Sequence, residues 1–283
     1  KDNLFSVLKQ VIDLDEDELS ELAGVLKYTS LSNVAKLVKM IEDRQKVIQG
    51  LKELVFDKEL YAKEVPHIQN TVENHYWLFG EQYNLITAAE PDFTLALKGL
   101  ILATTGKETR GNKAKLDHID KNKEMDIFMI RQDRKGDVTE NVVVELKRPT
   151  VALGEKELSQ VKKYMQVIRS NDRFNMGNVK WTFYLVGNKF NTSHFLEGEL
   201  ENNKNHGEEH LVYWVDNGMT KIYVLKWSEI FDEFSKRHEY LLEKLKLEEA
   251  LWLKQHGDAD EVVDDIINNS ATMDKPLVPK RAI

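Results

Sequence analysis

The sequence contains no cysteine among its 283 residues. Disulfide bonds, thiolate nucleophiles and cysteine-based zinc sites are therefore excluded, and we expect a reducing, cytoplasmic location. No apolar run approaches the ~20 residues that a membrane-spanning helix needs, and no secretory signal is visible, so we expect no membrane association. The first residue is Lys rather than Met, which raises the expectation that the chain is a fragment with an upstream domain missing.

Helix-breaking residues are scarce in the first sixty positions. Asp15 and Glu18 have the spacing of a capping box and predict a helix start. A second helix is predicted from Ser30 or Ser32, because apolar residues then recur about every 3.5 positions with no glycine before Gly50. We assign residues 1–60 to an N-terminal helical region for oligomerisation or regulation. A hairpin that packs on a neighbouring part of the chain and an amphipathic oligomerisation arm both fit the pattern.

Positive charge is deficient overall but is concentrated in one segment. The net charge is −8, yet residues 101–190 hold 18 Lys plus Arg and 12 Asp plus Glu, which is +6 locally and leaves −14 for the rest. A basic region on an acidic protein can hold a polyanion locally. An unevenly charged, solvated surface explains the same numbers, and charge alone does not separate the two.

The rest of the chain alternates strands and helices, which predicts an α/β fold with a mixed sheet flanked by helices. We assign residues 61–257 to this domain and residues 258–283 to an acidic C-terminal tail that is pinned to another part of the protein. The predicted strands are 83–86, 93–105, 125–130, 141–149, 181–188, 212–215 and 222–227, with hairpins at 125–149 and 212–227. The predicted helices are 67–79, 155–170 and 228–255.

One apolar strand, VVVELKRP at 142–149, carries an acid and a base two positions apart. Side chains alternate along a strand, so Glu145 and Lys147 share a face with Val143, while the other face feeds the core. Asp126 lies on the preceding strand of the hairpin, on a face with Phe128. We expect the hairpin to bring Asp126 close to Glu145.

Two carboxylates at a strand end suit Mg²⁺, or Mn²⁺ in its place. A metal there can activate water and neutralise charge during phosphodiester cleavage, and a neighbouring lysine can orient that water. The plain alternative is a surface ion pair between Glu145 and Lys147, which contributes about 0–1 kcal/mol.

The helix after this strand adds Gln160 and Tyr164 at i and i+4, on one face. Gln160 can hold the attacking water, and Tyr164 can hydrogen-bond a phosphate. Lys162 and Lys163 add positive charge nearby. An ordinary helix surface would show the same spacing.

Together these residues resemble the PD-(D/E)xK nuclease superfamily. Asp126 matches the motif aspartate with Met125 in place of proline, Glu145–Lys147 match (D/E)xK, and Gln160 with Tyr164 match a QxxxY element. Pro91-Asp92 spells the motif literally but lies farther from Glu145, so we choose Asp126. Longer stretches, VENHYWLFGEQY at 72–83 and KWSEIFDEFSKRHEYLLEKL at 226–245, are similar to the nuclease domain of Shedu anti-phage defence proteins, over about residues 60–250.

The resemblance implies a restriction-endonuclease-like core and a metal-dependent endonuclease that cleaves or nicks double-stranded DNA in bacterial antiviral defence, as a homo-oligomer (dimer or tetramer). It implies metal binding by Asp126, Glu145 and the Leu146 carbonyl, with help from Glu73 on the preceding helix. Lys147 and Gln160 then act on the water. The residues expected to contact nucleic acid are Arg148, Lys162, Lys163 and Tyr164.

Two alternatives remain open at the level of sequence. One is a nucleic-acid-binding or scaffold protein that keeps the nuclease fold but lacks turnover. The other is an unrelated helical interaction protein in which Glu145 and Lys147 form only a surface pair. Convergence of Asp126 with Glu145 distinguishes the second alternative from the others.

Overall fold

A computed structural model describes residues 14–80, 84–87, 96–100, 102, 126–133, 138–175, 178–245 and 256–268. The chain divides into two compact units, residues 1–45 and 46–283. The division falls inside helix α3 (Leu31–Phe56) rather than near residue 60, where the sequence pattern places it.

The first unit contains helix α2 (Glu16–Leu26) and the beginning of α3. The predicted capping box is present: the Glu18 N–H donates to the Asp15 carboxylate at 2.8 Å, and the Asp15 N–H donates to the Glu18 carboxylate at 3.0 Å. None of the α2 residues is buried. Large apolar side chains of this unit, Leu19, Val25, Tyr28 and Leu37 among them, are exposed.

The second unit is built on a mixed sheet of six strands in the order β1-β2-β3-β5-β8-β7. The three central strands β3, β5 and β8 are parallel, and β1, β2 and β7 pair antiparallel at the edges. Both predicted hairpins are therefore confirmed. The strand bounds are β1 (Asn84–Thr87), β2 (Ile127–Asp133), β3 (Val138–Leu146), β5 (Asn178–Gly187), β7 (Leu211–Val215) and β8 (Thr220–Lys226), with a separate pair of β4 (Ala152–Leu153) and β6 (Lys189–Phe190).

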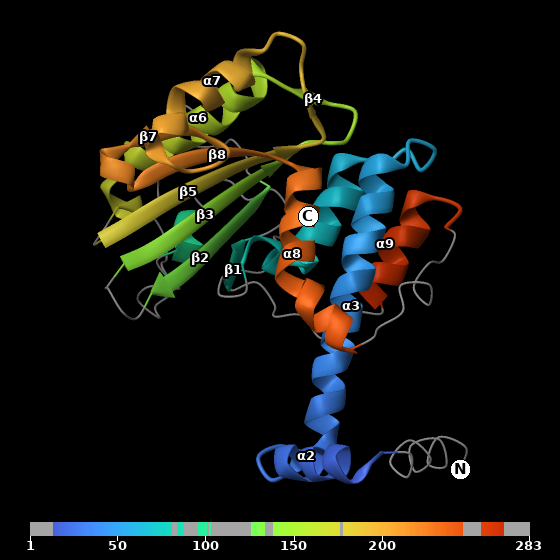
Figure 1. Cartoon of the computed structure of the whole chain (residues 1–283). Helices are drawn as coiled ribbons and strands as arrows, with labels where there is room; N and C mark the ends of the chain where they lie inside the picture. The colour runs from blue at the N-terminus through green and yellow to red at the C-terminus, as the bar shows by residue number, and fades with distance from the viewer. Residues whose placement is uncertain are drawn as a thin grey trace. The chain divides into compact units, whose positions relative to one another are not determined.

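Helices cover both faces of this sheet (Figure 1). Helices α6 and α7 pack on one face through a core that includes Phe128, Val143 and Trp181. The C-terminal part of α3, the η1 and α4 segments, α8 and α9 pack on the other face around Val142, Val144 and Leu146. The helix bounds are η1 (Glu64–Gln69), α4 (Asn70–Asn74), η2 (Tyr76–Phe79), α6 (Glu155–Arg169), η4 (Asp172–Phe174), α7 (Phe195–Asn203), η5 (Lys204–His206), η6 (Asp216–Gly218), α8 (Trp227–Leu245) and α9 (Ala259–Asn268).

Two predicted elements differ from the structure. Residues 96–100, inside the predicted strand 93–105, are helical. Ala96, Leu97 and Leu100 are buried on one side of this turn, and a short apolar run fits either a strand or a buried helix. The predicted single helix 67–79 is three pieces: the π-helical η1 continues directly into α4, and His75 then leaves helical geometry at φ −134° and ψ 43° and separates α4 from η2.

The acidic C-terminal segment is attached to the second unit through α9. Its apolar residues Ala259, Val262, Val263 and Ile266 are buried in the core on the α3 and α8 face. Asp260 also lies 3.1 Å from the His67 ring. The prediction that this segment is pinned is confirmed over residues 259–268, and the remainder of the tail lies outside the described residues.

Gly187, the last residue of β5, allows close packing against β4, so Gly187→Ala should destabilise the fold. A Cβ there would lie 2.7 Å from both Cγ and Cδ2 of Leu153, which is fully buried. We expect a loss of about 1–3 kcal/mol in the free energy of unfolding, measured by urea denaturation. Gly198→Ala in α7, where nothing lies within 4 Å of the new Cβ, should instead gain about 1 kcal/mol. Equal behaviour of the two variants would contradict the packing argument.

Candidate active site

The β2–β3 hairpin brings Asp126 to the end of β3. Ile127 pairs with Val144 and Phe128 with Val143, so continuing the register by one residue sets Asp126 opposite Glu145. Asp126 lies just before β2, and its Oδ2 accepts a hydrogen bond of 2.5 Å from the backbone N–H of Leu146. The carboxylates of Asp126 and Glu145 are therefore brought close together, as the strand pattern predicts.

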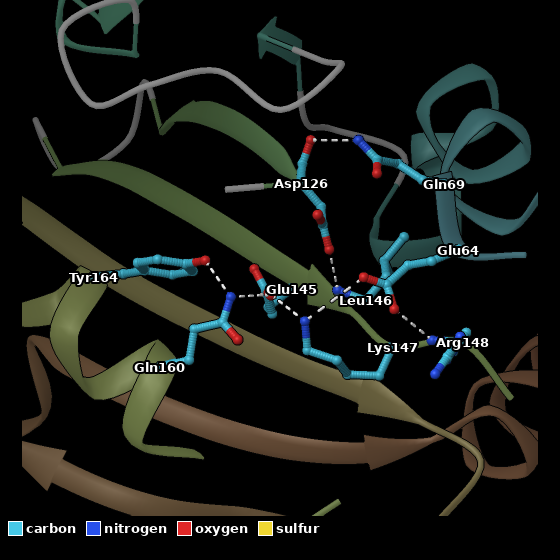
Figure 2. Close-up of polar contacts among 9 residues, drawn as sticks. All are labelled: Glu64, Gln69, Asp126, Glu145, Leu146, Lys147, Arg148, Gln160 and Tyr164. Atoms are coloured by element: carbon cyan, nitrogen blue, oxygen red, sulfur yellow. Dashed lines mark hydrogen bonds and ion pairs between the residues drawn. The ribbon is translucent and has the colours of Figure 1, made fainter. Parts of the chain in front are cut away.

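Glu145 is the centre of a hydrogen-bonded cluster (Figure 2). Its Oε1 forms an ion pair with the Lys147 ammonium and also accepts a hydrogen bond of 2.6 Å from the Gln160 side-chain amide. The same amide donates to the Tyr164 hydroxyl oxygen at 2.6 Å. Gln160 and Tyr164 do lie on one face of α6, and this face covers Glu145.

The cluster is buried, contrary to the open strand face that the sequence pattern suggests. Glu145 is 2% exposed, and Val143 on the same face is 1% exposed. The reason is that α6 packs over this face while α8 and its neighbours cover the other, so residues 141–146 of β3 are buried on both faces. An exposed surface pair of Glu145 and Lys147 is therefore ruled out.

One carboxylate oxygen of this cluster lacks a hydrogen-bond donor among the described residues. Glu145 Oε2 is buried and has no hydrogen-bond partner within the described part of the chain. Oε1 of the same carboxylate accepts hydrogen bonds from Lys147 and Gln160. A buried carboxylate oxygen without a donor is costly unless another positive group satisfies it.

Burial controls the protonation of both carboxylates. Loss of water raises the pKa of Asp126 well above its ordinary value, and the nearby negative charge of Glu145 raises it further. Burial also raises the pKa of Glu145, while the Lys147 charge and the hydrogen bonds from Lys147 and Tyr164 oppose that shift. A positive charge bound between the two carboxylates would stabilise their charged forms and so offset the effect of burial that raises both pKa values.

Lys147 stays charged in this setting. Burial by itself lowers the pKa of Lys147, but the charges of Glu145, Asp126 and Glu64 outweigh it, and the net pKa is raised. Lys147 is thus a fixed ammonium donor rather than a proton acceptor at neutral pH.

Glu64, at the start of η1, is a site residue that the sequence pattern does not indicate. Its Oε1 lies 3.8 Å from the Lys147 ammonium, and its Oε2 accepts a 2.7 Å hydrogen bond from the Arg148 N–H. Its charge also contributes to raising the pKa of Asp126 and Glu145. Its position two residues before Pro66, at the entry to the new unit, is the only sequence signal it carries.

Glu73, to which the resemblance assigns a supporting role in metal binding, is connected to Asp126 through one intervening residue. It is buried in α4, where its Oε1 accepts a 2.8 Å hydrogen bond from the Gln69 amide. That amide also lies 3.5 Å from the backbone oxygen of Asp126. Glu73 is thus linked to the main chain of Asp126 through Gln69, whereas Glu64 lies beside Lys147.

The residues predicted to contact nucleic acid occupy different surroundings. Arg148 and Lys163 are exposed. Lys162 lies on another side of α6, 3.4 Å from Glu199 and 5.0 Å from the centre of the Tyr213 ring. Tyr164 is 1% exposed, and its hydroxyl is engaged with Gln160, so in this conformation it supports Glu145.

The donor set fits a divalent cation in part. Among the described residues no three His, Asp or Glu side chains form a metal-binding group. Two carboxylates do lie close together, both offer oxygen atoms of the kind Mg²⁺ prefers, and one of these oxygens is buried with no donor in the part of the chain that the structure describes. Magnesium keeps several waters and takes one or two carboxylates, so two are sufficient for this metal. The Leu146 carbonyl as a third ligand stays a prediction.

Comparison of the chain with protein-family models, with curated proteins and with solved structures gives no match. The described helices include none that is both long enough and apolar enough to span a bilayer.

Proposed function

We propose that this protein is a Mg²⁺-dependent endonuclease with a restriction-endonuclease-like core, as the resemblance to PD-(D/E)xK and Shedu nucleases implies. The observation that carries the proposal is the state of Glu145. One oxygen is held by Lys147 and Gln160, and the other is buried beside a second carboxylate with no hydrogen-bond partner among the described residues. A solely structural ion pair gives no reason for that leftover oxygen or for two buried carboxylates.

Each residue has a role that follows from its contacts. Asp126 and Glu145 would hold the cation, which supplies Lewis-acid stabilisation of the phosphate and a more acidic water when bound. Lys147 donates hydrogen bonds and stabilises developing negative charge. Gln160 and Tyr164 are positioning residues that keep Glu145 Oε1 in place. Arg148 and Lys163, both exposed, are the proposed contacts to the DNA backbone.

The same proposal includes a homo-oligomer and a place in antiviral defence. Exposed apolar side chains on the first unit, such as Leu19, Val25 and Leu37, support association between copies. The defence role comes from the resemblance alone.

A plasmid-nicking experiment tests the activity. Supercoiled plasmid incubated with the full chain and Mg²⁺ should convert to open circles, because a bound cation completes the carboxylate pair. EDTA should stop the reaction and excess Mg²⁺ should restore it, as seen by gel electrophoresis. Nicking that persists unchanged in EDTA would contradict the metal-dependent mechanism, and the absence of cleavage under all conditions would favour a binding or scaffold protein.

A further inference from the structure

A second feature of the molecule, a cavity of about 940 Å³, adjoins the candidate active site. Glu64 and Arg148 line it, and the same two residues are joined by the hydrogen bond beside Lys147. The volume is at the upper end of the roughly 300–1,000 Å³ of small-molecule sites. The remaining walls come from the end of α3, the segment 57–66, the turn 148–150 and residues 188–189.

The cavity lies at the edge of the sheet where α/β proteins commonly bind ligands. Residues 148–150 follow the carboxyl end of β3, and Asn188 and Lys189 follow the carboxyl end of β5, which is parallel to β3. Crevices at the carboxyl ends of parallel strands are the common binding places in open α/β sheets. Glu145 and Lys147 come from the same end of β3, and the lining residue Glu64 lies 3.8 Å from the Lys147 ammonium, so an occupant of the cavity would lie near Lys147.

The lining combines an aromatic ring with several cations. Tyr61 is 83% exposed, and its backbone is held in the left-handed region at φ 48°. Lys58, Lys63, Arg148 and Lys189 line the cavity and are all exposed, whereas the acids among the described lining residues are Asp57 and Glu64. The Glu64 carboxylate is already engaged by the Arg148 N–H and lies near Lys147. Buried Leu54 and Val55 add an apolar wall.

We infer that this cavity binds an unpaired stretch of the DNA strand, with a base stacked on Tyr61 and phosphates held by the surrounding cations. Proteins bind single-stranded nucleic acid with a positively charged groove along the sugar-phosphate backbone and with exposed aromatic rings on which the bases stack. A duplex keeps its bases stacked inside and cannot place one on Tyr61. The inference rests on the proposed function, because cleavage of the bound DNA would take place at the candidate active site. It makes DNA with an unpaired segment the preferred substrate.

The test is a binding measurement that does not need activity. Full-length protein in EDTA is titrated into a labelled oligo(dT) of about 12 nucleotides, followed by fluorescence anisotropy. We expect oligo(dT) to bind more tightly than a duplex of equal length or oligo(U). Tyr61→Ala should weaken oligo(dT) binding about tenfold, because stacking of one base contributes about 1–3 kcal/mol. Tyr61→Phe, which keeps the ring, should bind as the parent does.

Matched variants separate the ring and the charges from general surface effects. Tyr28→Ala removes a tyrosine that is 92% exposed on the first unit and should leave binding unchanged. Lys58→Gln combined with Lys63→Gln should reduce the slope of log K against log[salt] by about 0.7 for each phosphate contact removed. Equal melting temperatures of the variants would show that the fold is retained.

Three results would overturn the inference: Tyr61→Ala binding oligo(dT) like the parent, Tyr61→Ala weakening duplex and oligo(dT) equally, or oligo(U) binding as tightly as oligo(dT). The outcome is independent of the nicking assay. Tyr61-dependent binding without metal-dependent cleavage would refute the proposed activity and support the pocket. Cleavage with no effect of Tyr61 would do the reverse.

Discussion

Replacing Lys147 with alanine should lower Mg²⁺-dependent nicking by about 10²–10³-fold or more, the usual effect of removing one preorganised electrostatic donor from an active site. Lys147 forms the ion pair with Glu145 and is the cation beside both carboxylates. The rate of plasmid conversion under single-turnover conditions measures this loss. Circular dichroism of the variant should show an unchanged secondary structure.

The chain offers a matched control in the same sheet. Lys180 and Glu140 form a comparable pair at 2.7 Å between β5 and β3, well away from residue 145 along the strand. Lys180→Ala should therefore leave nicking within about twofold of the parent, as expected for a partly exposed ion pair. If Lys147→Ala and Lys180→Ala nick equally fast, Lys147 has no special role in the reaction.

Asp126→Asn should stabilise the fold at neutral and alkaline pH while it abolishes cleavage. The carboxylate is buried beside Glu145, so its charged form is disfavoured in the folded protein. Asparagine keeps an oxygen that can accept the Leu146 N–H bond and removes the charge. We expect a gain of about 1–2 kcal/mol, the range in which catalytic groups trade stability for function. This corresponds to several degrees in the melting temperature.

The sign of the pH dependence follows from the direction of the Asp126 shift. Its folded pKa lies above its unfolded pKa of about 3.9, so the folded state binds the proton more tightly. The parent protein therefore loses stability as pH rises from the unfolded pKa through the folded pKa. Asp126→Asn lacks this loss, so its advantage should be near zero at about pH 4 and should grow as pH rises.

Melting curves in EDTA from acid to alkaline pH measure this difference. Asp232→Asn, a change at an exposed position of α8, should show no comparable advantage at any pH. Mg²⁺ should stabilise the parent and reduce the gap, because a bound cation relieves the two carboxylates. A constant difference between Asp126→Asn and the parent across the pH range would contradict the burial argument.

Local pattern by itself determined much of the scaffold. The period-2 alternation around Glu145 and the hairpin before it predict correctly that Asp126 and Glu145 meet, because the register of a hairpin fixes which residues are opposite. The i, i+4 spacing of Gln160 and Tyr164 places both on the α6 face that contacts Glu145. The capping box at Asp15 is equally local. These features depend only on the geometry of one element or of adjacent elements.

Only the tertiary structure decided the features that depend on distant segments. Glu64 reaches Lys147 and Arg148 across more than eighty positions of sequence, and no periodicity links them. Whether β3 is covered on one face or on both depends on where α6 and α8 pack, and that packing buries Glu145 and shifts its pKa. The helical state of residues 96–100 and the cavity beside Tyr61 likewise follow from packing, since short apolar runs and exposed loops have no pattern of their own.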